Sequence, residues 1–172
     1  MQRIARRDER AFAALYDRYA VRMHRYFYRM LWRDAARAED FTQELFLKII
    51  EKPQLFDPNR SFRTWVYALA ANLCKNEFRR KKPAGPEWPE LETDPGPGPD
   101  GLDRPVFEAT LRAAIDRLSE PQRQCFVLRY QEELPVAEIA AILDCPEGTV
   151  KSRLHYALQQ ISEQMTIFKP GL

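Results

Sequence analysis

Apolar residues recur every three or four positions along most of this chain, a spacing typical of amphipathic helices. One long stripe predicts a helix over 11–30. A second stripe predicts a helix that stops before Pro53, because a residue preceding proline avoids helical backbone. A third predicted helix has Ser61 as its N-cap and ends in the basic run 79–82. No stretch shows the alternation of a strand, so the pattern predicts an all-α protein.

The second half shows shorter helical units. A helix is predicted over 107–118, and the capping box 119–122 (SEPQ) opens another that runs to Tyr130. Residues 134–161 then form two short amphipathic stretches separated by Asp-Cys-Pro, which predicts a helix-turn-helix. Pro146 and Glu147 suit the first turn of its second helix, since proline lacks an N–H and a carboxylate complements the helix dipole.

The second helix of this motif has an outer face suited to DNA. If Val150 and Leu154 face inward, with Ala157 or Leu158 beyond them, the first two turns present a polar and partly cationic surface. Those turns are the ones that meet base edges in a major groove. The candidate residues are Lys151, Ser152, His155 and Tyr156, with Arg153 on the flank. An ordinary helical hairpin with solubilising cations is the alternative.

Proline and charge divide the chain into three parts. Seven of the 13 prolines and four of the six glycines fall in 83–105, which predicts an extended linker without a core. Residues 1–82 carry 19 Lys and Arg against 10 Asp and Glu, the linker 1 against 6, and residues 106–172 7 against 9. We therefore expect two small helical domains, 1–82 and 106–172, joined by an acidic linker. The basic first domain implies an anionic partner such as nucleic acid.

Other features narrow the class of protein. Three cysteines without a CxxC or Cys/His cluster predict neither a disulfide framework nor a metal site. No apolar run is long enough to span a membrane, and the first residues lack the apolar core of a signal peptide. We expect a cytoplasmic protein that needs no cofactor and has no catalytic residue.

The predicted third helix combines aromatic, amide and cationic side chains. Residues 1–82 hold 14 of the 20 aromatic residues, several of them at the start of this helix. Aromatic rings stack on unpaired bases while cations follow the phosphates, so this composition favours single-stranded nucleic acid. The candidate residues are Trp65, Tyr67, Asn72, Lys75, Asn76, Arg79 and Arg80. For Trp65 a purely structural place in the core is an equal alternative.

The order of these motifs resembles a bacterial RNA polymerase sigma factor of the extracytoplasmic-function group. The resemblance rests on AFAALYDRY, AEDFTQELFLKI, FDPNRSFRTWVYALAANLCKNEFRRKK, LSEPQRQCFVLRY and the helix-turn-helix with GTVKSRL, and it covers nearly all of residues 5–162. It implies that the first domain captures and melts the promoter minus-ten element and that the second reads the minus-thirty-five element as duplex. It also implies core RNA polymerase and promoter DNA as partners, an anti-sigma factor as a regulator, and a monomer when free.

The resemblance assigns roles residue by residue. Asp40, Gln43 and Glu44 match the family's pattern for docking on the polymerase, and 53–60 matches the loop that holds a flipped-out minus-ten base. Trp65, Tyr67, Asn72 and Asn76 match positions at and after that loop. The minus-thirty-five reading face is matched by Lys151, Ser152, Arg153, His155 and Tyr156. Many relatives carry Arg at the position of Tyr156, so the promoter sequence cannot be transferred from them.

Two other functions compete with this interpretation. A dimeric helix-turn-helix repressor would use residues 1–82 to sense a ligand, which predicts a sealed apolar pocket. A helical hydrolase would use Glu39, Asp40 and Glu44 as metal ligands or as acid and base, because Asp40 and Glu44 share a helix face. No histidine accompanies these carboxylates in their helix.

Overall fold

The computed structural model describes residues 1–80 and 104–166, and every regular element in these ranges is helical. The long helix predicted first is α2 (Glu9–Met30), which begins where the Asp8 carboxylate accepts the Ala11 N–H at 2.9 Å. This contact satisfies one of the free amides of the first turn. The short helix α1 (Gln2–Ala5) precedes it and was not predicted, because four residues are too few to show a periodic pattern.

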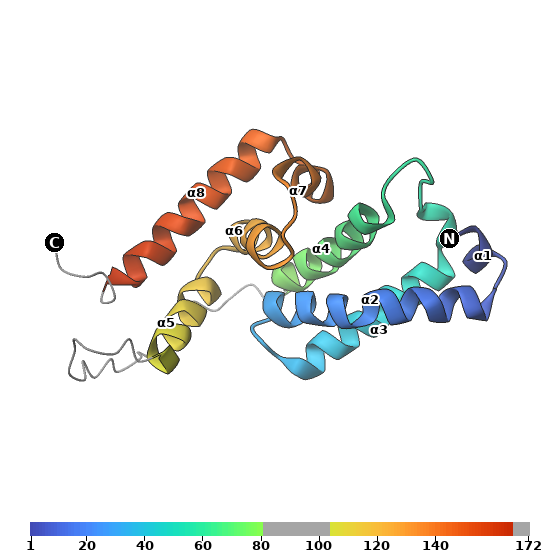
Figure 1. Ribbon diagram of the computed structural model, residues 1–172, viewed down its shortest axis with the longest axis horizontal. Coiled ribbons are helices and arrows are strands. Elements are labelled where there is room, and N and C mark those ends of the chain that lie inside the picture. Colours follow the sequence, from blue (N-terminus) through green and yellow to red (C-terminus); the bar gives the residue numbers. More distant parts are fainter. Residues whose placement is uncertain (81–103, 167–172) are drawn as a thin grey trace.

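The remaining N-terminal helices follow the predicted order. Helix α3 (Ala35–Glu51) is capped by Asp34 and ends before Pro53, as predicted. A single 3-10 turn, η1 (Pro53–Leu55), leads into the loop before α4 (Phe62–Arg80). In Figure 1, α2 and α3 lie side by side, and α4 extends from them toward the C-terminal helices.

The C-terminal helices also follow the predicted order. They are α5 (Arg104–Asp116), α6 (Glu120–Phe126), α7 (Val136–Leu143) and α8 (Glu147–Gln164). The predicted capping box is present before α6. Beyond α6 the chain continues as a π-helical turn, η2 (Val127–Gln131), so the helix predicted to reach Tyr130 changes its hydrogen-bond pattern after Phe126. Pro146 is the N-cap of α8 rather than its first helical residue.

The predicted linker 83–105 lies almost wholly outside the described residues. The two helical groups on either side of it nevertheless pack against each other. Helix α7 contacts α4, and η2 contacts α2, while α8 lies on the far side of α6 and α7 (Figure 1).

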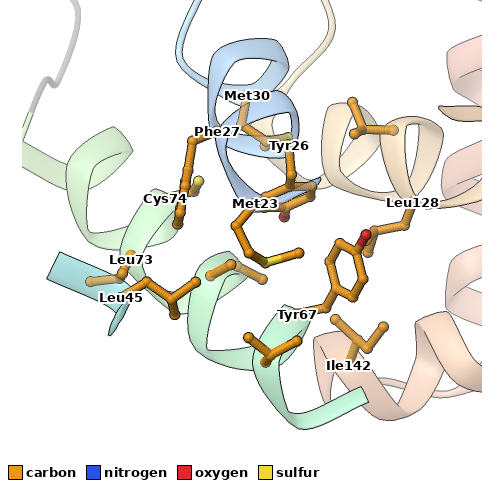
Figure 2. Packing of buried hydrophobic residues seen from close by; sticks show 14 of the residues in the cluster. Met23, Tyr26, Phe27, Met30, Leu45, Tyr67, Leu73, Cys74, Leu128 and Ile142 are labelled. Carbon is orange, nitrogen blue, oxygen red and sulfur yellow. The ribbon is translucent and has the colours of Figure 1, made fainter. Parts of the chain in front are cut away.

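One buried cluster extends through both groups. Figure 2 shows Met23 and Tyr26 of α2 beside Tyr67 of α4, with Leu128 and Ile142 of the C-terminal group close by. Each of these five side chains is at most 5% exposed. A smaller cluster lies between α5, α6 and α8. In α8 the buried residue is Ala157, whereas Leu158 is 43% exposed, which decides between the two inward positions that the sequence left open.

Candidate nucleic-acid and polymerase interface

The outer face of α8 is exposed where the sequence predicted it. Lys151, Ser152, His155 and Tyr156 are all exposed, while Val150, Leu154 and Ala157 on the opposite face are buried. The turn before α8 is tight because Asp144 adopts left-handed backbone with φ 48°, and the Cys145 N–H donates to the Ala140 carbonyl at 3.1 Å. Asp is among the few residues that tolerate this conformation. The exposed side chains therefore project from a helix that is anchored along its other side.

Arg153 lies apart from this face. It is half-buried, and its Nη1 donates to Cys145 Sγ at 3.8 Å. The neighbouring Cys125 thiol is fully buried, and its burial raises its pKa to about 11, although Arg153 acts in the opposite direction. Arg153 thus connects α8 to the turn before it.

The residues predicted to bind single-stranded nucleic acid lie on two sides of α4. Asn72, Lys75, Asn76, Arg79 and Arg80 are exposed. At about 100° per residue, Asn72, Asn76 and Arg79 share one face of the helix with Trp65. Trp65 is half-buried, with its ring centroid 5.3 Å from that of Phe56, so it supports the loop before α4.

Tyr67 lies on the other side of α4 and is 1% exposed. Its ring packs edge-on against Tyr26 at 5.5 Å, and its hydroxyl donates to the Glu132 carboxylate. Burial and the hydrogen bond to Glu132 raise the pKa of Tyr67 well above its ordinary value. The C-terminal group therefore covers this predicted DNA contact.

The predicted polymerase-docking residues lie on the solvent side of α3. Asp40, Gln43 and Glu44 are exposed, and Glu44 pairs with Lys48 at 2.8 Å. Leu47 and Ile50 extend the same side of the helix and are 56% and 43% exposed. The residue pattern did not predict a role for these two apolar residues, although Leu47 falls outside the inward stripe of α3.

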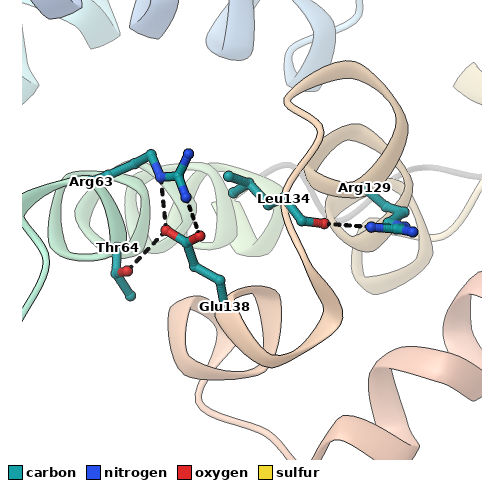
Figure 3. A network of polar contacts seen from close by, with 5 residues as sticks. All are labelled: Arg63, Thr64, Arg129, Leu134 and Glu138. Atoms are coloured by element: carbon teal, nitrogen blue, oxygen red, sulfur yellow. Dashed lines mark hydrogen bonds and ion pairs between the residues drawn. The ribbon is translucent and has the colours of Figure 1, made fainter.

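A set of polar contacts between the two groups was also not predicted. The Glu138 carboxylate of α7 accepts from the Arg63 guanidinium and from the Thr64 hydroxyl of α4 (Figure 3). Arg123 of α6 is 1% exposed, and its guanidinium carbon lies 5.2 Å from the Trp32 ring centroid. In the sequence, only the opposite net charges of the two domains indicated that such contacts could form.

The turn between α2 and α3 positions two side chains that contact the C-terminal group. Trp32 and Arg33 both adopt left-handed backbone, with φ of 53° and 61°. Trp32 contacts Arg123, and Arg33 pairs with Asp116 at 2.8 Å. Such backbone is unfavourable for residues other than glycine, by roughly 1 kcal/mol or more each, so surrounding contacts must stabilise it.

Neither a metal site nor a membrane-spanning helix is found in the described part of the chain. Residues 1–80 and 104–166 contain no group of three His, Cys, Asp or Glu side chains placed to hold a metal ion. None of their helices is both long enough and apolar enough to cross a bilayer.

These features together define a class: a two-part helical protein with a helix-turn-helix for DNA. Comparison with known families matches residues 15–83 to Sigma-70 region 2 and residues 108–161 to Sigma-70, region 4. The ECF RNA polymerase sigma factor SigW of Bacillus subtilis is 32% identical to this chain, over 96% of it and 94% of SigW. RpoE of Cereibacter sphaeroides is 33% identical over 93% and 89%. The chain therefore belongs to the sigma-70 family, in its extracytoplasmic-function group.

Solved structures agree on the fold. CnrH, solved in complex with the cytosolic domain of CnrY, gives a TM-score of 0.71 at 20% identity and covers 96% of this chain and 94% of CnrH. RpoE of Bartonella quintana, solved with the anti-sigma factor NepR, gives 0.69 at 20% identity over 92% and 99%. The predicted all-α, two-domain fold and the predicted family are confirmed. Members of this family are transcription initiation factors rather than enzymes. The family therefore excludes the hydrolase alternative, and it favours an initiation factor over the dimeric repressor.

Proposed function

We propose that this chain binds core RNA polymerase and directs it to promoters whose minus-thirty-five duplex is read by α8. The observation that carries this proposal is the outer face of α8, where four polar or cationic side chains are exposed opposite a buried apolar side. A helix of this kind fits the major groove, which is about 12 Å wide.

In this proposal the N-terminal part binds the minus-ten element. Asn72 and Asn76 present amides one turn apart, and Lys75, Arg79 and Arg80 supply nearby cations for phosphates. Bases that have left the duplex gain roughly 1–3 kcal/mol each by stacking on aromatic rings. Trp65 lies near the N-terminal end of α4, which the loop 53–60 precedes, and we expect such a base to bind there.

Polymerase docking is assigned to the exposed side of α3. Asp40, Gln43 and Glu44 offer carboxylates and an amide, and Leu47 and Ile50 add apolar surface beside them. Interfaces commonly combine an apolar centre with a polar rim. This composition supports a protein partner better than it supports a solvated helix face.

The docking assignment is tested by reversing two charges. We expect Asp40→Lys with Glu44→Lys to weaken binding to core RNA polymerase by at least about tenfold, since like charges at an interface cost several kcal/mol. Surface substitutions of this kind change stability by only about 0.5 kcal/mol, so the helix content should be unchanged. Binding is measured by titrating labelled core polymerase, and helix content by circular dichroism.

A matched control separates this site from net charge. Glu9 and Asp17 are also exposed but belong to α2, so Glu9→Lys with Asp17→Lys makes the same change in charge on another helix. This control should bind core polymerase as the wild type does. Equal binding by both double variants would refute the docking assignment.

The minus-thirty-five face yields a second prediction. Lys151→Ala should cost about 1–3 kcal/mol on the preferred sequence and relax the preference at one base pair, because a lost base contact removes sequence information. Arg153 is turned toward Cys145, so Arg153→Ala should weaken preferred and unrelated sequences alike, by loosening the start of α8. A binding array of duplex sequences measures both. Uniform loss for Lys151→Ala would show that this side chain does not contact a base.

An anti-sigma factor is the regulator that we propose for this chain. The proposal is supported by the Bartonella quintana relative, whose structure was solved with the anti-sigma factor NepR. We also propose that free chain is monomeric and acts in the cytoplasm, where polymerase and promoter DNA are found.

A further inference from the structure

Two of the three free cysteines lie beside one arginine at the start of α8. Cys145 is half-buried in the bend between α7 and α8, and its Sγ accepts from Arg153 Nη1 at 3.8 Å. Cys125 is fully buried in α6, and its thiol interacts electrostatically with both Arg153 and Cys145. The two thiols therefore form a pair around a single guanidinium.

The packing of the C-terminal helices brings these thiols together from separate elements. Helix α8 contacts both α6 and α7, and the bend that carries Cys145 leads directly into α8. A disulfide requires the two Cα atoms to lie about 4.4–6.8 Å apart. Cys145 is the partner that can adjust to this distance, because it lies between two helices, whereas Cys125 lies within one.

The two thiols differ in how an oxidant reaches them. Burial raises the pKa of Cys125 to about 11, so this thiol is protonated at neutral pH and closed to solvent. Cys145 is only half-buried, and Arg153 places a permanent positive charge beside its sulfur. The thiolate is the form that attacks an oxidant, and it occurs in electropositive, partly exposed surroundings. Cys145 is therefore the thiol that reacts first, and Cys125 is the one that completes the bridge.

We propose that Cys125 and Cys145 form a reversible oxidation site whose disulfide lowers the affinity of α8 for duplex DNA. The effect on DNA rests on the proposed function, whereas formation of the disulfide does not depend on it. Disulfides in reducing compartments are usually transient and redox-sensing rather than structural. A half-exposed thiol with a second thiol buried nearby fits that use.

The oxidation consists of two balanced steps, with a hydroperoxide as the oxidant. The Cys145 thiolate attacks hydrogen peroxide, so that an S–O bond forms, the O–O bond breaks and hydroxide leaves, which gives a sulfenic acid. The Cys125 sulfur then attacks the sulfenic sulfur. An S–S bond forms, the S–O bond breaks, and the leaving hydroxide takes the Cys125 proton as water. The two thiols together lose two electrons to the peroxide, and a dithiol reductant returns them by exchange.

The disulfide changes the start of the helix that is proposed to read DNA. Cys145 lies two residues before Glu147, where α8 begins, and the exposed Lys151 and Ser152 follow in its first two turns. The bridge ties the bend to α6 and takes the Cys145 sulfur away from Arg153. We expect the oxidised chain to bind its preferred duplex about tenfold more weakly, which is the effect of losing one good base contact.

The experiment measures the bridge and DNA binding separately in the full chain. Reduced protein is treated with hydrogen peroxide, digested without reductant and analysed by mass spectrometry for a peptide pair that joins Cys125 to Cys145. Fluorescence anisotropy then measures binding to the duplex that the reduced wild type prefers on the binding array. Peroxide should weaken this binding about tenfold, and dithiothreitol should restore it.

Cys145→Ser is the decisive variant. Serine keeps the approximate shape and an acceptor for Arg153 but cannot form the bridge, so its affinity for the duplex should be the same before and after peroxide. Cys74→Ala is the matched control, because Cys74 is fully buried in α4 and is not a member of the pair. This control should respond to peroxide as the wild type does. Circular dichroism checks that each variant keeps its helix content.

Each outcome decides between the hypotheses. Absence of the Cys125–Cys145 peptide pair after peroxide treatment would overturn the oxidation site. A bridge that forms without weakening DNA binding would overturn its effect on α8, and so would an equal loss of binding by Cys145→Ser. If the reduced wild type binds no duplex on the array, the proposed function fails, while the peptide pair still tests the oxidation site by itself.

Discussion

Replacing Arg123 with alanine is expected to destabilise the chain by about 2–5 kcal/mol, because two carbonyls lose a charged hydrogen-bond donor and a cavity is left in the packing. Arg123 is 1% exposed, and burial lowers the pKa of its guanidinium only to about 10, so it is charged at neutral pH. Its Nη1 donates to the Met30 carbonyl at 3.2 Å, and its Nη2 donates to the Asp116 carbonyl. Alanine would leave both acceptors unpaired and a cavity beside Trp32 and Phe78.

Urea unfolding followed by circular dichroism measures this loss. Arg112→Ala is the matched control, because Arg112 is exposed and pairs across one helical turn with Glu108 at 2.8 Å. Exposed pairs of this kind contribute about 0.3–0.5 kcal/mol. Arg123→Lys should fall between the two, since lysine keeps the charge but lacks the planar fork that reaches two carbonyls. A loss below about 1 kcal/mol for Arg123→Ala would contradict the role given to this residue.

The double variant Asn72→Ala with Asn76→Ala is expected to abolish promoter opening while leaving duplex binding at the minus-thirty-five element intact. Both amides are exposed, one helical turn apart, on the face of α4 that the C-terminal group leaves uncovered. Flipping a base out of the stack costs a few kcal/mol, which contacts to the flipped base must offset. Removing both amides takes away contacts that exist only after the strands have separated. Permanganate reactivity of thymines near the start site measures opening directly.

Protein stability provides a built-in control for this variant. Alanine is a better helix former than asparagine by roughly 0.5–0.7 kcal/mol at an exposed position, so the double variant should be slightly more stable than the wild type. Loss of opening together with unchanged or raised stability would therefore report a lost contact with DNA. Persistent thymine reactivity in the double variant would show that these amides do not hold the melted strand.

Residue patterns alone were sufficient to predict every α-helix except the short α1, together with the order of the helices and the two-part division. The spacing of apolar residues predicted α2, α3, α4 and α8. Pro53 predicted the end of α3, and the capping box 119–122 predicted the start of α6. These features depend on contacts between residues near each other in sequence, so a single sequence contains them. The exposed positions of α8 followed from the same periodicity, because one face of a helix determines the other.

The tertiary structure alone decided how the two parts meet, since contacts between distant residues leave no periodic trace in one sequence. Tyr67 has the composition of a DNA contact yet is buried against Tyr26 and Glu132. Arg63 belongs to the basic N-terminal part, yet its guanidinium pairs with Glu138 of α7. In both cases the side chain's partner comes from another element, and its charge or aromatic character says nothing about which element lies nearest. The sequence by itself determined which surfaces each helix offers, and the packing of α4 against α7 determined which of them are covered.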